Sequence, residues 1–132
     1  MLERNKGGIL TRSKATEFAQ RWVAAWNRRD VDAVLAHYVE DAIFISPKAQ
    51  NLVGATTIRG KKALEHYWRT ASAKLHTLEF ILERIAWDGE SRELVVFYEA
   101  NLNGTKTRTC EAMSFDDQGR QVSGEALYGA AV

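Results

Sequence analysis

The feature of this sequence that most constrains its fold is a change in the spacing of apolar residues after His76. Before that point apolar side chains recur mainly every three or four residues, which is typical of amphipathic helices. After it they alternate with polar side chains, as in half-buried β-strands. A chain that changes period in this way is expected to place its helices first and to fold its second half into an antiparallel sheet.

Four strands are predicted in the second half of the chain, over residues 76–87, 92–102, 105–115 and 120–130. The turn at Asn103-Gly104 is the strongest signal among them, because a two-residue hairpin turn needs positive φ at both central positions. We therefore expect the four strands to form an antiparallel meander.

Three amphipathic helices are predicted in the first half, over residues 13–29, 31–38 and 61–75. Ser13 and Asp30 are the expected N-caps of the first two helices. Their side-chain oxygens can accept hydrogen bonds from backbone amides that have no partner inside the helix.

The segment between the second and third helices is expected to contain one short strand. Residues 42–46 are nearly all apolar and are followed by the single proline, Pro47, which fits a strand covered on both faces. Residues 48–60 contain glycines and polar side chains, and they predict a loop with a short extended piece at 56–58.

Length and composition predict one domain. The 132 residues have a mass of 14.9 kDa and 45% of them are apolar, which is enough to fill one core. We expect a flexible N-terminal tail over residues 1–12 and a single domain over 13–132.

The charge of the chain argues against two classes of partner. The net charge is +1 and there are no long runs of like charge, whereas proteins that bind nucleic acid or a membrane surface usually carry a basic patch. The lone cysteine, Cys110, cannot close an intrachain disulfide, which suits a cytoplasmic protein.

One acid stands out on the third predicted strand. Met113 and Phe115 share a face with Glu111, whereas Cys110 and Ala112 face the other way, so Glu111 is expected to be the only acid on the inner face. A buried carboxyl that stays protonated has the raised pKa that acid–base catalysis near neutral pH requires. A single β-bulge would instead turn this side chain outward, so the alternation alone leaves a structural role equally open.

The last predicted strand is expected to place Val122, Ala126 and Tyr128 on the inner face and Gln121 on the outer face. This assignment assumes that the strand has no bulge, because one extra residue reverses the order of the two faces.

The second predicted strand carries bulky apolar residues on both faces, with Val96 and Tyr98 on one and Val95 and Phe97 on the other. No helix remains to cover the outer face. We therefore expect a homodimer that packs through this outer face.

The order of these elements resembles the nuclear-transport-factor-2-like superfamily, in its SnoaL-like and ketosteroid-isomerase-like branch. The resemblance covers residues 13–130 and is most specific at Trp26–Val34, Tyr38–Pro47, Ile58–Leu64 and Gly124–Gly129. It implies an α+β fold in the order α-α-β-α-β-β-β-β. The fold it implies is a cone-shaped barrel of a curved, mainly antiparallel sheet wrapped around the long N-terminal helix, with a pocket at the wide end.

The resemblance also implies roles for individual residues. The aspartate base of ketosteroid isomerases corresponds to Ser46, which cannot take up a proton at neutral pH. The oxyanion-hole tyrosine of the first helix corresponds to Trp22, and two supporting tyrosines correspond to Tyr38 and Trp68. The oxyanion-hole acid, and the acid–base aspartate of SnoaL-like polyketide cyclases, fall on Glu111.

Together these observations predict an isomerase, cyclase or dehydratase that acts on a small hydrophobic carbonyl compound without a metal or other cofactor. The three histidines do not have metal-ligand spacing, and no glycine-rich phosphate loop is present. Glu111 is the expected catalytic residue. The expected substrate-binding residues are Trp22, Trp26, Tyr38, Ser46, Trp68, Met113 and Tyr128. The alternative is a non-catalytic module that binds a ligand or another protein, because one fold can host both.

Overall fold

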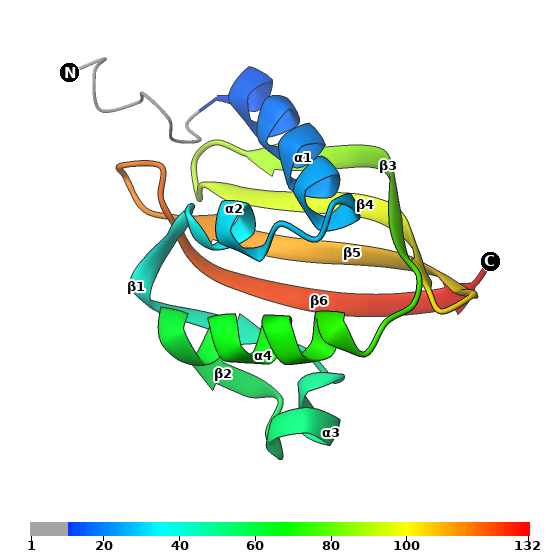
Figure 1. Cartoon of the computed structure of the whole chain (residues 1–132). Helices are drawn as coiled ribbons and strands as arrows, with labels where there is room; N and C mark the ends of the chain where they lie inside the picture. Colours follow the sequence, from blue (N-terminus) through cyan, green and yellow to red (C-terminus); the bar gives the residue numbers. More distant parts are fainter. Residues whose placement is uncertain (1–10) are drawn as a thin grey trace.

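The computed structural model describes residues 11–132, which form a curved six-stranded sheet with helices on its concave side (Figure 1). The elements are α1 (Arg12–Asn27), α2 (Val31–Leu35), β1 (Tyr38–Ile45), α3 (Ala49–Val53), β2 (Thr57–Arg59), α4 (Lys61–Ala73), β3 (Leu78–Asp88), β4 (Glu93–Leu102), β5 (Thr105–Phe115) and β6 (Gln121–Ala131). The predicted α+β class and the antiparallel meander β3–β6 are confirmed.

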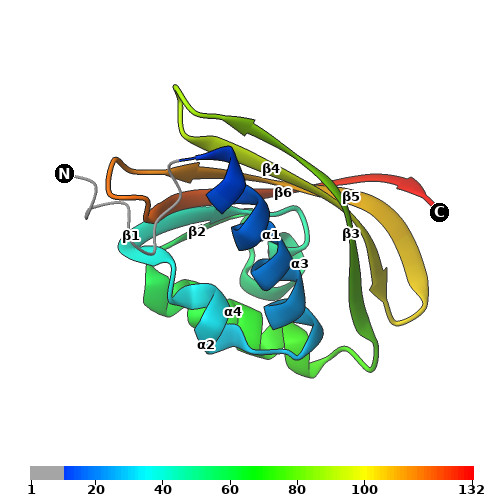
Figure 2. The ribbon, with the colours of Figure 1, turned by 90° about the horizontal axis from the view of Figure 1, so that it is seen from above.

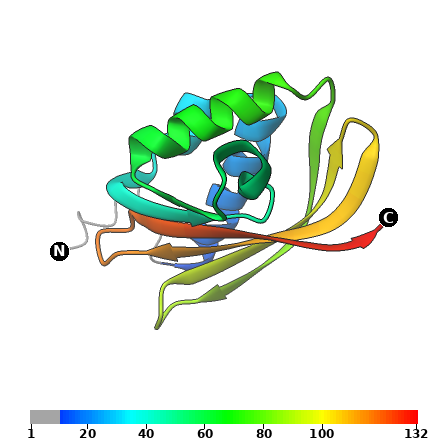
Figure 3. The ribbon, with the colours of Figure 1, turned by 90° about the horizontal axis from the view of Figure 1, so that it is seen from below.

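The sheet has the strand order β2-β1-β6-β5-β4-β3, and all neighbours are antiparallel except β1 and β6. It is strongly curved but does not close into a barrel, since β2 and β3 remain as edges. Helix α1 packs on β3 and helix α4 packs on β1, so the two helices complete the cone that the sheet leaves open (Figures 2 and 3).

Two side chains, one at the end of α1 and one just after it, tie this part of the chain to β3 and to the end of α4. The Asn27 side chain donates to the Phe80 carbonyl at 3.0 Å and accepts from the Phe80 amide at 2.7 Å, which ties α1 to β3. The Arg29 guanidinium donates to the carbonyls of Ser72 at 2.9 Å and Leu75 at 2.8 Å, where α4 ends. The Arg29 bonds tie the end of α4 to the segment that follows α1.

The structure confirms one of the two predicted N-caps and corrects the other. The Asp30 carboxylate accepts from the Ala33 amide at 3.0 Å and caps α2, as predicted. Helix α1 is capped by Thr11 rather than Ser13, through a 3.2 Å bond from the Lys14 amide. Arg12 is therefore helical, and the rest of the expected tail, residues 1–10, lies outside the described residues.

The region between α2 and α4 differs from the prediction in two places. Tyr38 was expected at the end of the second helix, but it begins β1, where pairing with β6 at Gln121 takes over from the helix. The expected loop 48–60 contains the short helix α3, which ends at Gly54 with φ of 77°. The extended piece predicted at 56–58 corresponds to β2.

A β-bulge at the start of β6 overturns the predicted faces there. Ser114 pairs with Ser123 and Phe115 pairs with Gln121, so Val122 is the extra residue. Because the bulge reverses the alternation, Gln121 is fully buried on the inner face and Val122 is only partly buried. Beyond the bulge Ala126 faces inward, as predicted.

Candidate functional site

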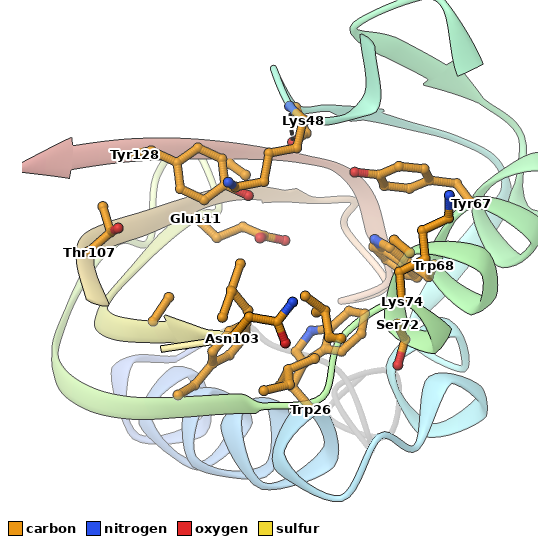
Figure 4. A pocket seen from close by; sticks show the side chains of 18 of the residues that line it. Trp26, Lys48, Tyr67, Trp68, Ser72, Lys74, Asn103, Thr107, Glu111 and Tyr128 are labelled. Atoms are coloured by element: carbon orange, nitrogen blue, oxygen red, sulfur yellow. Dashed lines mark hydrogen bonds between the residues drawn. The ribbon is translucent and has the colours of Figure 1, made fainter. Parts of the chain in front are cut away.

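A cavity of about 510 Å³ lies between the sheet and helices α1 and α4 (Figure 4). Eight aromatic side chains line it, among them Trp22 and Trp26 from α1, Trp68 from α4, Phe80 from β3 and Tyr98 from β4. The Trp22 ring lies 5.7 Å from Phe80 and 5.3 Å from Tyr98 between ring centroids. Such a volume and wall suit a flat, mainly apolar small molecule.

Glu111 points into this cavity from the middle of β5 (Figure 4). Val96 of β4 and Ala126 of β6 flank it in the sheet, and only 5% of Glu111 is exposed. Burial raises the pKa of its carboxyl from 4.5 to about 8, because removal from water penalises the charged form. The carboxyl is therefore mostly protonated at pH 7.

Ser46, Tyr67 and Tyr128 form a second polar group in the cavity wall. The Ser46 hydroxyl accepts a hydrogen bond from the Lys48 backbone amide at 3.2 Å and lies close to both phenols, whose pKa it lowers. Burial raises the pKa of both phenols, that of Tyr128 to about 12, although Ser46 offsets part of this effect. Both tyrosines therefore carry their protons at neutral pH.

The phenol groups of Tyr67 and Tyr128 supply further hydroxyls in the cavity wall. Because each phenol keeps its proton at neutral pH, its O–H can donate to a bound molecule. Together with protonated Glu111, these hydroxyls give the cavity its O–H donors.

Behind Glu111, a glycine makes room for a buried polar cluster. The Gln121 side-chain amide donates to the Tyr38 hydroxyl at 2.9 Å and to the Ser123 carbonyl at 3.2 Å. A Cβ at Gly124 would lie 2.8 Å from the Tyr38 hydroxyl and 3.3 Å from both the Glu111 Oε2 and the Gln121 Nε2 atoms. The absence of a side chain at Gly124 therefore lets three polar groups approach one another.

The structure brings six of the eight expected site residues together around the cavity. They are Glu111, Trp22, Trp26, Ser46, Trp68 and Tyr128. Tyr38 and Met113 are buried, 4% and 1% exposed, but neither lines the cavity. Tyr38 instead belongs to the polar cluster behind Glu111.

Sequence reasoning missed Tyr67, Gln121 and Gly124. Tyr67 lies in the apolar set of the third predicted helix, and nothing in that spacing distinguishes a pocket residue from a core residue. Gln121 was assigned to the outer face because the bulge is not visible in the alternation. Within residues 11–132, the two buried side-chain polar atoms without a hydrogen-bond partner are Gln121 Oε1 and Trp22 Nε1, and Trp22 lines the cavity.

In the part of the chain that the structure describes, no three His, Cys, Asp or Glu side chains are grouped so that they could hold a metal ion. None of the helices there is both long and apolar enough to span a bilayer.

The sequence matches the family model described as SnoaL-like domain over residues 19–124. No curated protein matches it significantly. A SnoaL-like protein of unknown function from Burkholderia thailandensis E264 has a similar structure, with a TM-score of 0.81, 27% identity and coverage of 92% of this chain and 98% of that one.

Two solved structures of named enzymes share the fold. SalBIII is described as an epoxide hydrolase/cyclase-like enzyme of pyran ring formation in salinomycin. It is 17% identical with a TM-score of 0.73 and covers 92% of this chain and 95% of its own. A steroid delta-isomerase from Pseudomonas aeruginosa is 22% identical with a TM-score of 0.67 and covers 88% and 80%.

Proposed function

Because the chain belongs to the family of SnoaL-like domains, we propose that it is an isomerase, cyclase or dehydratase that acts on a hydrophobic carbonyl compound by acid–base chemistry. The observation that carries this proposal is the Glu111 carboxyl, which has a pKa of about 8 and points into an aromatic cavity. A group with a pKa near the working pH can both take up and release a proton. The cyclase-like and isomerase names of the two enzymes above agree with it.

In this proposal Glu111 moves a proton within the substrate. The ionised carboxylate removes a proton from the carbon beside the carbonyl, which leaves an enolate and protonated Glu111. The phenol O–H of Tyr67 or Tyr128 donates to the enolate oxygen as its charge develops. Glu111 then returns the proton to another carbon, so an isomerisation is complete without loss or gain of atoms. The other aromatic side chains hold the substrate flat against the wall.

Exchange of carbon-bound protons tests this chemistry without knowledge of the natural substrate. The methyl protons of 2-acetylnaphthalene, a flat ketone, should exchange with deuterium in D₂O faster with the protein than without it, as measured by NMR. Glu111→Gln should abolish the acceleration, because the amide cannot take up the proton. Glu125→Gln, on the same sheet but exposed, is the matched control and should retain it.

Two other outcomes would change the conclusion. If 2-acetylnaphthalene binds and its exchange is not accelerated, the chain is better described as a non-catalytic binding module. If Glu111→Gln accelerates exchange as well as the unmodified protein does, another group moves the proton.

We also propose that the protein is a homodimer in the cytoplasm that packs through the outer face of its sheet. Ile81 and Leu127, 52% and 45% exposed, lie among the large apolar side chains that remain in contact with solvent. The Arg84 guanidinium stacks over the Phe97 ring on this face at 3.8 Å. Large apolar side chains exposed on a sheet face favour a contact between two copies.

A further inference from the structure

The charged side chains around the cavity are unequally distributed. Lys48 and Lys74 are the cations in its lining and Glu111 is its one acid, among the residues that the structure describes. Because burial holds Glu111 mostly protonated at neutral pH, the two lysines are not balanced by a negative charge from the cavity wall. The cavity therefore has a positive mouth and a neutral interior.

Both lysines line this cavity, Lys48 on the side of Tyr128 and Lys74 at the end of α4 (Figure 4). The Lys48 ammonium lies 4.6 Å from the centre of the Tyr128 ring, whose face holds it beside the cavity. Lys74 is the C-cap residue of α4, and it borders the cavity with Ser72. Both lysines are exposed, so their ammonium groups are at the mouth rather than inside.

Neither lysine has an acidic partner elsewhere in residues 11–132. The ion pairs there use arginines only, for example Arg69 with Glu65 and Arg108 with Glu83. Two cations without counter-charges raise the local concentration of anions and favour an anionic group of a bound molecule.

We propose that the preferred ligands of this cavity are amphipathic carboxylates, with a flat apolar body, a carbonyl group at one end and a carboxylate at the other. The body packs against the tryptophans, the carbonyl reaches Glu111, and the carboxylate stays partly hydrated at the mouth, where Lys48 and Lys74 make the potential positive. The requirement for a carbonyl group rests on the proposed function, whereas the preference for a negative charge rests on the two lysines.

Two probes of equal size distinguish the effect of ligand charge on affinity from the effect of ligand shape. They are 6-acetyl-2-naphthoate and 2,6-diacetylnaphthalene, which have the same ring, one ketone in common and the same number of heavy atoms. Binding can be followed by the fluorescence of the cavity tryptophans and by calorimetry at pH 6.5 and 20 mM salt. We expect the carboxylate to bind about tenfold more tightly, the effect of two exposed charge contacts, and the ratio to fall towards one at 500 mM salt.

Removal of the lysine charges should remove the preference and leave the binding of the neutral probe unchanged. Lys48→Gln and Lys74→Gln should each lower the ratio two- to fourfold, and the double variant should bring it close to one. Lys62→Gln, on the outer side of the same helix as Lys74, is the matched control and should keep the ratio. Unchanged affinity for 2,6-diacetylnaphthalene shows that each variant is folded around an intact cavity.

Several results would overturn the inference. They are equal or tighter binding of the neutral probe, a ratio that the double variant does not change, or failure of both probes to bind at millimolar concentration. The Glu111→Gln variant separates the two proposals, because it should abolish proton exchange and keep the carboxylate preference. A lysine-dependent preference without catalysed exchange would support this inference and refute the proposed function.

Discussion

Replacement of Glu111 by Gln should change how the stability of the protein depends on pH. In the unfolded chain the carboxyl has its ordinary pKa of 4.5, and in the folded protein the pKa is about 8. Below pH 4.5 the group is protonated in both states, so it does not make the stability depend on pH. Between pH 4.5 and 8 only the folded state holds the proton, so its stability falls as the pH rises.

The size of this effect follows from the two pKa values. Each unit of difference corresponds to about 1.4 kcal/mol, so a rise from 4.5 to about 8 amounts to about 5 kcal/mol at pH 8 and above. For a domain whose total stability is on the order of 5–15 kcal/mol, this is a large fraction. The side chain is 95% shielded from solvent, so screening by water does not reduce the effect to that of a surface group.

Urea unfolding at pH 5, 6, 7, 8 and 9 measures this directly. The difference in unfolding free energy between Glu111→Gln and the unmodified protein should grow by about 1.4 kcal/mol per pH unit up to pH 8 and then level off. All other titrating groups are the same in both proteins, so their contributions to the unfolding free energy cancel when the two values are subtracted. Glu125→Gln, an exposed substitution on β6, should show no such trend. A difference that is constant from pH 5 to 9 would refute the raised pKa.

Three further predictions concern the cluster behind Glu111 and the outer face. Gly124→Ala should lower the unfolding free energy by about 1–3 kcal/mol, since the added Cβ comes within 2.8 Å of the Tyr38 hydroxyl. Gly89→Ala, whose Cβ comes no nearer than 3.4 Å to a neighbour, should cost less in the same urea titration. Tyr38→Phe should cost about 1–2 kcal/mol in thermal unfolding, because the buried Gln121 amide loses an acceptor, and a neutral effect would show that this bond is unimportant. Light scattering at micromolar concentration should give the mass of a dimer, and Leu127→Lys should give that of a monomer. A monomeric unmodified protein would exclude the dimer.

The sequence predicts the sheet well where side chains alternate without interruption. The inner face of β5, with Glu111 between Thr109 and Met113, follows from the alternation because no bulge interrupts it between Cys110 and Ser114. The Asn103-Gly104 turn follows from the backbone preference of two residues, and both have positive φ in the structure.

The parts that were not predicted depend on contacts between distant segments. Gln121 faces inward because of a bulge whose position is set by the pairing of β6 with β1 and β5. Tyr67 joins the cavity because α4 packs against β1, and helical spacing alone does not encode that contact. Local patterns therefore identified the acid but not the hydroxyl groups and the glycine that surround it.

The most direct test of the account is the titration of the Glu111 carboxyl in the folded protein. Carbon-13 NMR of protein labelled at the glutamate carboxyl carbons follows each carboxyl separately, and the Glu111→Gln variant assigns the signal. We predict that this one signal titrates near pH 8. If the Glu111 signal instead titrates near its ordinary value of 4.5, the carboxyl is ionised throughout the neutral range and the proposed proton transfer is wrong.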